Sequence, residues 1–227
     1  PARASVTMRL VRSPFLFSNA LHSLCTKRNS SRFTKRFAFT RDIDESLKSD
    51  ALTMNVANQQ TIDLARARHQ HETLMNVLKN VGLTVHNLPS DGFPDSVFIE
   101  DTCVIIDNVA LITRPGAKSR QGETARVREY LKTIELKVLL VTDLEEGHVD
   151  GGDVMFTGKE ILVGLTTRTD EAGIRALQKA FPNYPVRMVD MENLARKASI
   201  ADPNDREDVL HLKSLCSMCG EGTILLG

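Results

Sequence analysis

The stretch Val109-Ala-Leu-Ile-Thr113 decides the fold, because its pattern returns twice further along the chain. It is matched by Glu160-Ile-Leu-Val-Gly164 and by Thr223-Ile-Leu-Leu-Gly227, at offsets of 51 and 63 residues. Each copy is predicted as the second strand of a hairpin, which a tight turn such as Asp107-Asn108 joins to the first strand. A unit that recurs about every fifty residues indicates stacked or radially arranged supersecondary structure.

Around these copies the same order of elements recurs, namely two strands, a helix and a closing strand. The predicted elements of the three units, in chain order, are strands 97–107 and 109–113, helix 119–133, strand 136–141, strands 153–157 and 160–164, helix 170–181, strand 186–189, and strands 210–218 and 223–226. Before the first unit, an amphipathic helix over 59–80 leads into an alternating strand over 83–88.

Three features fall outside this repeat. Residues 191–208 are polar and contain a proline, so they are predicted as an inserted surface loop that lengthens the second offset. Residues 1–38 are predicted as a basic leader, either disordered or a mitochondrial transit peptide, ahead of one catalytic domain over 39–227. Because the third unit reaches Gly227 without its helix and closing strand, we expect a chain truncated at the C-terminus.

Charge and cysteine usage limit the function class. The chain has 29 basic and 29 acidic residues, but residues 1–41 hold nine of the basic ones and none of the acidic ones. The remaining residues carry a net charge of −9, which argues against nucleic acid as a partner. No apolar stretch of 18 residues predicts a membrane span. Four cysteines do not suggest a disulfide-built fold, so a cytoplasmic location is expected, or a mitochondrial one if the leader is a transit peptide.

Acidic residues gather at the start of the predicted units. Asp95, Glu100 and Asp101 lie at the first hairpin, and Asp150 and Asp153 enclose a Gly-Gly pair at the second. In a radial arrangement these positions converge on the axis, where a pocket can form. Carboxylates there would accept paired hydrogen bonds from a planar guanidinium.

Two arginines and a histidine extend this pattern. Arg120 and Arg168 follow the first and second hairpins, and arginine forks suit a substrate carboxylate. His211 opens the third unit, so acids for a cation and arginines for an anion together describe an arginine-like ligand. Taken singly, the features have plainer explanations: a turn, a structural histidine and a solvated arginine. Cys216 and Cys219 form one Cys-x-x-Cys pair, which does not suffice to predict a metal site.

Several long motifs resemble the dimethylarginine dimethylaminohydrolases, a family of the guanidino-group modifying superfamily. They are Phe-Pro-Asp-Ser-Val-Phe-Ile-Glu-Asp at 93–101, Ala-Leu-Ile-Thr-Arg-Pro-Gly-Ala at 110–117, Asp-Gly-Gly-Asp-Val-Met-Phe-Thr-Gly at 150–158, Val-Gly-Leu-Thr-Thr-Arg-Thr at 163–169 and Leu-His-Leu-Lys-Ser-Leu-Cys-Ser-Met at 210–218. The resemblance runs from about residue 39 to 227. It implies a five-bladed α/β propeller (pentein) of pseudo-fivefold repeats, with about the first three repeats present.

The resemblance also implies an activity, the hydrolysis of Nω-methylated arginines to citrulline and methylamines, which regulates nitric oxide synthesis and needs no cofactor. Asp101, helped by Glu100, would clamp the guanidinium, and Asp95 would meet the α-amino group of the substrate. Arg120 and Arg168 would grip its α-carboxylate.

Further implied roles concern catalysis and access. His211 would be the general acid and base, and Asp150 would hold and polarise its imidazole. Leu52 would lie on a flexible lid. The nucleophilic cysteine of the family lies in its last repeat, and Cys216 cannot replace it if both it and His211 lie on one strand with opposite faces. Cys103 shares the expected face of Asp101, but the family uses no thiol there, so the isolated chain is expected to be inactive and unstable.

Two alternatives remain open at this point. A deiminase acting on arginine or agmatine is an enzymatic one, although the two arginines imply a substrate carboxylate that agmatine lacks. A nucleophile-free form that binds methylarginine or a protein partner without turnover is the other. The sequence is compatible with a monomer or a homodimer.

Overall fold

The computed structural model describes residues 37–52, 62–134, 140–191, 210–220 and 223–226. These residues form four small sheets of two or three strands each, with helices packed on them. Most of the predicted leader and of the predicted insertion lies outside the described residues.

The first predicted unit forms a three-stranded sheet. β3 (Cys103–Ile106) pairs antiparallel with β4 (Val109–Ile112), and β4 pairs in parallel with β5 (Leu140–Asp143). α3 (Thr124–Thr133) makes the crossover between the two parallel strands, which is the usual way to connect them. β5 extends beyond the predicted strand 136–141, most of which lies outside the described residues.

The second unit repeats this arrangement. β6 (Val154–Phe156) pairs antiparallel with β7 (Ile161–Leu165), and β7 pairs in parallel with β8 (Val186–Asp190). α4 (Glu171–Ala180) connects the parallel strands. It begins after Asp170, whose side chain accepts a hydrogen bond from the backbone N–H three residues on, a helix N-cap. The predicted order of two strands, helix and strand is confirmed in both units.

A further β-α-β element precedes these units. β1 (Phe37–Arg41) pairs in parallel with β2 (Thr84–Leu88), and α2 (Leu64–Asn80) connects them after the short helix α1 (Leu47–Asp50). The sequence predicts α2 and β2 but not β1. The first two residues of that strand were assigned to the basic leader over 1–38, which hid its pattern.

The third unit differs from the sequence prediction at a point that bears on the site. The predicted strand over 210–218 is wrong in its first part, because α6 (Leu212–Leu215) occupies it. β9 (Cys216–Gly220) follows and pairs antiparallel with β10 (Thr223–Leu226). His211 therefore lies immediately before a helical turn and not within a strand.

Tight helical turns also replace the edges of three other predicted elements. The strand predicted over 97–107 begins as the 3-10 helix η3 (Ile99–Thr102), and η5 (Gly151–Asp153) precedes β6. The helix predicted over 119–133 begins as η4 (Lys118–Glu123). These turns carry acidic residues of the candidate site and some of the residues that hold them in place. Because the backbone is helical there, the side chains do not alternate between two faces as they do in a strand.

The core lies between the sheets and their helices. Its largest cluster joins the first two units, and its most deeply buried members are Leu111, Val149, Ile161, Val163 and Leu177. A separate cluster joins β6 to the third unit through Met155, Met191, Leu212, Cys216 and Met218. Burial of these side chains holds the units together, and the turns that precede their first strands contact one another: η3 contacts η5, and η5 contacts α6.

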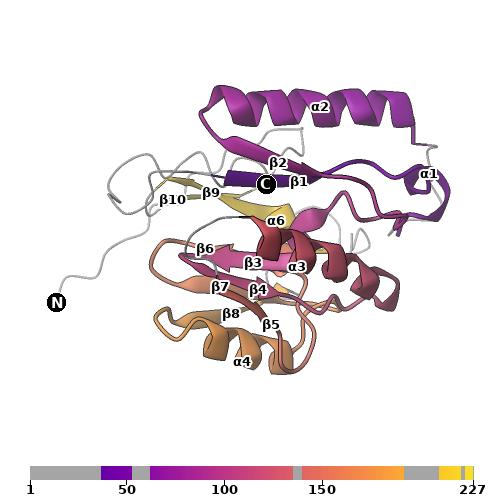
Figure 1. Cartoon of the computed structure of the whole chain (residues 1–227). Helices are drawn as coiled ribbons and strands as arrows, with labels where there is room; N and C mark the ends of the chain where they lie inside the picture. The colour runs from indigo at the N-terminus through magenta and orange to yellow at the C-terminus, as the bar shows by residue number, and fades with distance from the viewer. Residues whose placement is uncertain (1–36, 53–61, 135–139, 192–209, 221–222, 227) are drawn as a thin grey trace, which may run out of the picture.

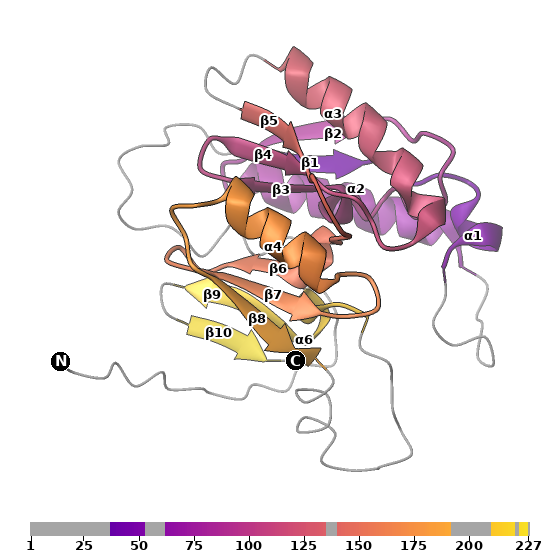
Figure 2. The same ribbon diagram turned by 90° about the horizontal axis from the view of Figure 1, so that it is seen from below.

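Figure 1 shows α2 along one side of the molecule above β1 and β2, and α4 along the opposite side below β8. The short α6 lies between them, close to the first strands of the units. In the second view, α3 and α4 cover the outer faces of their sheets (Figure 2). None of the described helices combines the length and the apolar character needed to cross a membrane.

Candidate active site

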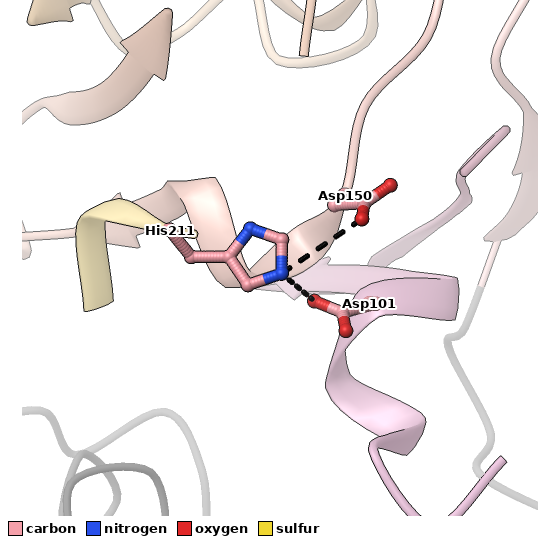
Figure 3. A group of neighbouring side chains, drawn as sticks. All are labelled: Asp101, Asp150 and His211. Carbon is pink, nitrogen blue, oxygen red and sulfur yellow. Dashed lines mark ion pairs between the residues drawn. The ribbon is translucent and has the colours of Figure 1, made fainter. Parts of the chain in front are cut away.

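Three short helical turns, one from each unit, bring together His211, Asp101 and Asp150. Asp101 lies in η3, Asp150 directly precedes η5, and His211 directly precedes α6. The Nε2 atom of His211 is 3.8 Å from Oδ1 of Asp101 and 3.8 Å from Oδ2 of Asp150 (Figure 3). All three side chains are buried, with exposed fractions of 8%, 3% and 0% for His211, Asp101 and Asp150.

The Gly-Gly pair makes this approach possible. A Cβ atom on Gly152 would lie 2.7 Å from Oδ1 of Asp101 and 2.8 Å from the imidazole ring of His211. A Cβ atom on Gly151 would lie 1.9 Å from the carbonyl oxygen of Glu100. The Asp-Gly-Gly-Asp motif therefore does more than make a turn, because only glycine leaves room for the first and third units.

The carboxylate of Asp101 is held at both oxygens. Oδ1 accepts a hydrogen bond of 2.7 Å from the backbone N–H of Gly152, and Oδ2 accepts one of 2.6 Å from Nη1 of Arg120. Charge-assisted hydrogen bonds of this length are among the stronger ones in proteins. The orientation of Asp101 toward His211 is thus fixed by residues of two units.

Arg120 is held by several protein groups. Its guanidinium is 5% exposed and is engaged with protein groups: Nε and Nη2 donate to Glu123 at 3.0 and 2.9 Å. Nη2 also donates to the backbone oxygens of Asp95 and Phe98 at 3.1 and 3.2 Å. Burial lowers the pKa of Arg120, but Glu123 and Asp101 outweigh it and raise the pKa above its ordinary value. The geometry therefore makes Arg120 a support for Asp101, and its grip on a substrate carboxylate stays a prediction.

Arg168 differs from Arg120 in this respect. It is half-buried, and among the described residues its side chain has no hydrogen-bond or ion-pair partner. Its backbone packs on Gly116, where a Cβ atom would lie 2.5 Å from the carbonyl oxygen of Arg168. A grip by Arg168 on a substrate carboxylate stays a prediction that this free guanidinium allows.

Asp95 and Leu52 lie together, as two residues expected to meet the same ligand would. The backbone N–H of Leu52 donates to both carboxylate oxygens of Asp95, at 3.2 and 3.1 Å. Asp95 is buried and the Leu52 side chain is 46% exposed. Residues 53–61, which follow Leu52, lie outside the described residues, so the lid stays a prediction.

Glu100 is joined to the third unit. Its carboxylate accepts a hydrogen bond of 3.0 Å from Nζ of Lys213 on α6. The two side chains are 25% and 16% exposed, so this ion pair lies at the edge of the buried cluster. The predicted help of Glu100 to Asp101 in binding a guanidinium would compete with Lys213 for the same carboxylate.

Asp153 supports His211, a role that the sequence did not indicate. Its Oδ1 accepts a hydrogen bond of 3.1 Å from the backbone N–H of Leu212, the residue after the histidine. Its Oδ2 accepts hydrogen bonds from the hydroxyls of Thr166 and Thr169 at 2.8 and 2.6 Å, and lies 3.5 Å from Nδ1 of His211. The sequence shows Asp153 as an acidic residue after the two glycines, but the residues that it contacts come from segments distant in the sequence.

Burial and mutual repulsion shift the acid–base groups. Burial and the negative charge of Asp101 raise the pKa of Asp150 to about 6, although a 2.8 Å hydrogen bond from the Gly116 N–H opposes this. Burial lowers the pKa of His211, but Asp153, Asp101 and Asp150 outweigh it and raise the pKa above its ordinary value. The surrounding carboxylates therefore favour the imidazolium form of His211, which can donate a proton.

Cys103 and Cys216 are poorly suited to act as nucleophiles. Burial raises the pKa of Cys103 to about 12 and that of Cys216 to about 11, so their thiols stay protonated at neutral pH. Cys216 and His211 do not lie on opposite faces of one strand, as the sequence suggested, because α6 separates them. Its Sγ instead lies 3.5 Å from the carbonyl oxygen of Leu212.

The central cluster also resembles a metal-binding geometry. One ligand atom from each of Asp101, Asp150 and His211 lies within 4.8 Å of the others. A bound cation would use the same oxygens that are expected to receive a guanidinium. The predictions that no metal and no cofactor take part therefore stay predictions.

Comparison with known proteins gives this geometry a context. A family model described as eukaryotic N,N dimethylarginine dimethylhydrolase matches residues 35–204. An N(G),N(G)-dimethylarginine dimethylaminohydrolase of Streptomyces coelicolor is 43% identical over 137 residues, which are 60% of this chain and 47% of that protein. The human putative hydrolase DDAH2 is 32% identical over 192 residues, 84% of this chain and 61% of that protein.

A solved structure agrees with the sequence relatives. A cysteine-to-serine variant of DDAH from Pseudomonas aeruginosa, in complex with citrulline, superposes with a TM-score of 0.68 and 30% identity. The match covers 86% of this chain and 70% of that one. It confirms the predicted fold class, an α/β propeller of repeated units. The chain spans about half to three fifths of the length of the curated relatives described above.

Proposed function

The chain belongs to the eukaryotic N,N-dimethylarginine dimethylhydrolase family, and on that premise we propose that it forms the substrate pocket and acid–base centre of a methylarginine hydrolase. The reaction would convert Nω-methylated arginines to citrulline and methylamines. The observation that carries the proposal is the burial of His211 among three carboxylates, with Nε2 at 3.8 Å from both Asp101 and Asp150.

The proposed substrate contacts follow from charge. Asp101, with Glu100, would accept hydrogen bonds from the guanidinium, since carboxylates pair well with this planar cation. Asp95 would meet the α-ammonium group next to the Leu52 N–H that already contacts it. Arg168 would receive the α-carboxylate, because its guanidinium is free of protein partners among the described residues.

The proposed reaction has two stages. A thiolate attacks the guanidinium carbon, a C–S bond forms, and the C–N bond to the methylated nitrogen breaks as His211 gives that nitrogen its proton. Water then attacks the same carbon, His211 takes a proton from it, and the C–S bond breaks to release citrulline and thiolate. The thiol would be the cysteine that the family carries in its last repeat, since Cys103 and Cys216 have raised pKa values of about 12 and 11.

His211 and Asp150 have complementary parts in this scheme. The raised pKa of His211 keeps it protonated when an amine has to leave. Asp150 would stabilise the imidazolium by its charge, and its Oδ2 has no hydrogen-bond partner among the described residues. Because methylarginines inhibit nitric oxide synthase, the proposed turnover would also regulate nitric oxide synthesis.

The direct test is citrulline formation from asymmetric dimethylarginine by the purified protein and two histidine variants. His211→Gln is expected to lower kcat by at least about a hundredfold, the usual contribution of general acid–base catalysis. His148→Gln is the matched control, because His148 is a half-exposed histidine that pairs with Asp170 at 2.9 Å outside the pocket. Full activity of His211→Gln would refute the proposed role.

Binding without turnover is the second candidate function. The raised pKa values of Cys103 and Cys216 favour it, because both thiols stay protonated at neutral pH. Isothermal titration with dimethylarginine distinguishes the candidates: binding with no citrulline supports the second, and citrulline formation supports the first. A protein that neither binds nor hydrolyses dimethylarginine would exclude both.

A further inference from the structure

We infer that Glu123 is a positioning residue of the pocket, which fixes Arg120, and through it Asp101, and so sets the preference for a cationic ligand over a neutral one. This inference rests on the proposed function, because the cationic and neutral ligands are its substrate and product. Glu123 lies outside the pocket and had no role assigned to it from the sequence.

The contact between Glu123 and Arg120 is a two-point pairing. Oε1 accepts from Nε at 3.0 Å and Oε2 accepts from Nη2 at 2.9 Å. Two parallel hydrogen bonds fix the plane of a guanidinium as well as its position. Glu123 is 1% exposed, so water does not compete for these bonds.

The plane of the Arg120 guanidinium determines which groups its remaining N–H donors contact. With Nε and Nη2 held by Glu123, Nη1 points at Oδ2 of Asp101 over 2.6 Å. Nη2 also spans the backbone oxygens of Asp95 and Phe98, at 3.1 and 3.2 Å. One guanidinium thus ties down the loop that carries Asp95 and Asp101, and Glu123 is the group that orients it.

Glu123 is itself anchored on its far side. It is the last residue of η4, directly before α3, and its backbone oxygen lies 3.5 Å from Nη1 of Arg41. Arg41 is fully buried at the end of β1 and forms an ion pair of 2.6 Å with Asp91. Burial raises the pKa of Glu123, Arg120 lowers it, and nearby Asp95 and Asp91 raise it further.

Charge gives Glu123 a second effect on the pocket. Asp101 and Arg120 alone would form a neutral pair, to which an incoming guanidinium has little attraction. The carboxylate of Glu123 offsets the charge of Arg120, so the three buried groups together carry one negative charge. That charge would favour a cationic methylarginine and would leave neutral citrulline almost unaffected.

The experiment compares two ligands on two variants by isothermal titration at neutral pH. Glu123→Gln removes the charge and one of the paired bonds while it keeps the shape. Glu171→Gln is the matched control, because Glu171 pairs with Arg175 at 3.3 Å on the surface of α4, with both side chains 65% exposed. Asymmetric dimethylarginine and citrulline are the two probes. Where dimethylarginine is turned over, its KM from initial rates replaces the Kd.

We expect Glu123→Gln to weaken dimethylarginine about tenfold, in line with the loss of a charged hydrogen-bond partner, and citrulline by less than about threefold. Glu171→Gln should change neither affinity. Equal weakening of both ligands would show a merely structural role and overturn the inference, as would unchanged affinities.

Two further arms keep the test decisive. If Glu123→Gln does not fold, Glu123→Asp replaces it: this variant keeps the charge but is too short to hold both Nε and Nη2 of Arg120, so dimethylarginine should weaken more than citrulline, and equal weakening or unchanged affinities would contradict the inference. If the unaltered protein binds neither ligand, the proposed function fails by itself. The Nε–H signal of Arg120 in an NMR spectrum then tests Glu123: the paired Nε–H should exchange slowly with water, Glu123→Gln should speed this exchange, and an unchanged exchange rate would refute the pairing.

Discussion

At the scale of single residues, the site depends on what Gly152 lacks. Asp101 and His211 come from turns of different units, and both occupy the space where a Cβ atom of residue 152 would lie. The backbone N–H of Gly152 then donates to Asp101 at 2.7 Å. Glycine at this position therefore provides close approach and a hydrogen bond at once, without a left-handed backbone conformation.

This geometry predicts the effect of Gly152→Ala. The added Cβ atom would lie 2.7 Å from Oδ1 of Asp101 and 2.8 Å from the His211 ring, so one of them has to move. We expect a loss of about 1–3 kcal/mol in the free energy of unfolding, typical of overpacking, together with weaker dimethylarginine binding. Urea unfolding and isothermal titration measure the two effects.

Gly158→Ala provides the comparison for that variant. Gly158 has a φ of 88° in the β6–β7 turn and open space around its Cβ position, so alanine there brings backbone strain alone. It should cost about 1–2 kcal/mol and leave ligand affinity unchanged. An alanine at 152 that keeps full affinity would show that Asp101 and His211 tolerate displacement.

Sequence reasoning reached the acidic and basic residues of the site but not all of their partners. Asp101, Asp150 and His211 were predicted to act together, and the structure brings them together. Glu123 has no role predicted from the sequence, and Asp153 is predicted only as one of the cavity carboxylates, because the contacts that both make join segments far apart in the chain. Such support depends on side-chain packing between units, which motif spacing does not contain.

At the scale of elements, the period of the hydrophobic pattern predicted α3, α4 and the paired strands of the first two units correctly. It failed at η3, η5 and α6, which the sequence presented as parts of strands. These turns are too short to show a helical period, and their polar residues serve the site. The strands carry the fold, whereas the turns at their beginnings carry the chemistry.

The N-terminus of α4 is linked to the segment that carries Asp150. Asp170 accepts hydrogen bonds from Gly173 N at 2.7 Å and pairs with Nδ1 of His148 at 2.9 Å. Its own backbone N–H donates to the carbonyl oxygen of His148 at 3.1 Å, two residues before Asp150. The helix cap thus also holds the segment that leads into Asp150.

Asp170→Ala should therefore lower the free energy of unfolding by about 1 kcal/mol, the usual cost of losing an N-cap. Asp170→Asn is the informative comparison, because asparagine caps helices about as well as aspartate but cannot form the ion pair with His148. Thermal or urea unfolding followed by circular dichroism measures both variants. An alanine variant as stable as the asparagine one would mean that the cap contributes little.

At the scale of the whole molecule, the units meet at their acidic turns, and folding forces those turns out of water. Asp101 and Asp150 are buried against one another, which raises the pKa of Asp150 to about 6. An isolated unit would leave these carboxylates solvated. The molecule thus holds a destabilising charge in its centre, which is typical of functional sites.

That charge makes stability depend on pH in a defined direction. The pKa of Asp150 is about 6 in the folded protein, against about 3.9 for an unfolded chain. Between these values the folded state binds the proton more tightly, so the contribution of Asp150 to the free energy of unfolding falls as the pH rises from about 4 to about 6. Above that range the ionised group costs up to about 3 kcal/mol.

Asp150→Asn should consequently stabilise the protein at pH 7 by up to about 3 kcal/mol and should have little effect near pH 4, where Asp150 is neutral in the folded protein and only about half ionised in the unfolded chain. An asparagine oxygen can still accept the Gly116 N–H, so the fold keeps that bond.

Asp143→Asn, in a surface ion pair with Arg128, serves as the control and should show no such gain. Urea unfolding at the two pH values decides the matter: equal stability of Asp150→Asn and the unaltered protein at pH 7 would mean that Asp150 does not carry the buried charge. If the gain is found together with a loss of dimethylarginine binding, the same carboxylate destabilises the empty pocket and serves the ligand.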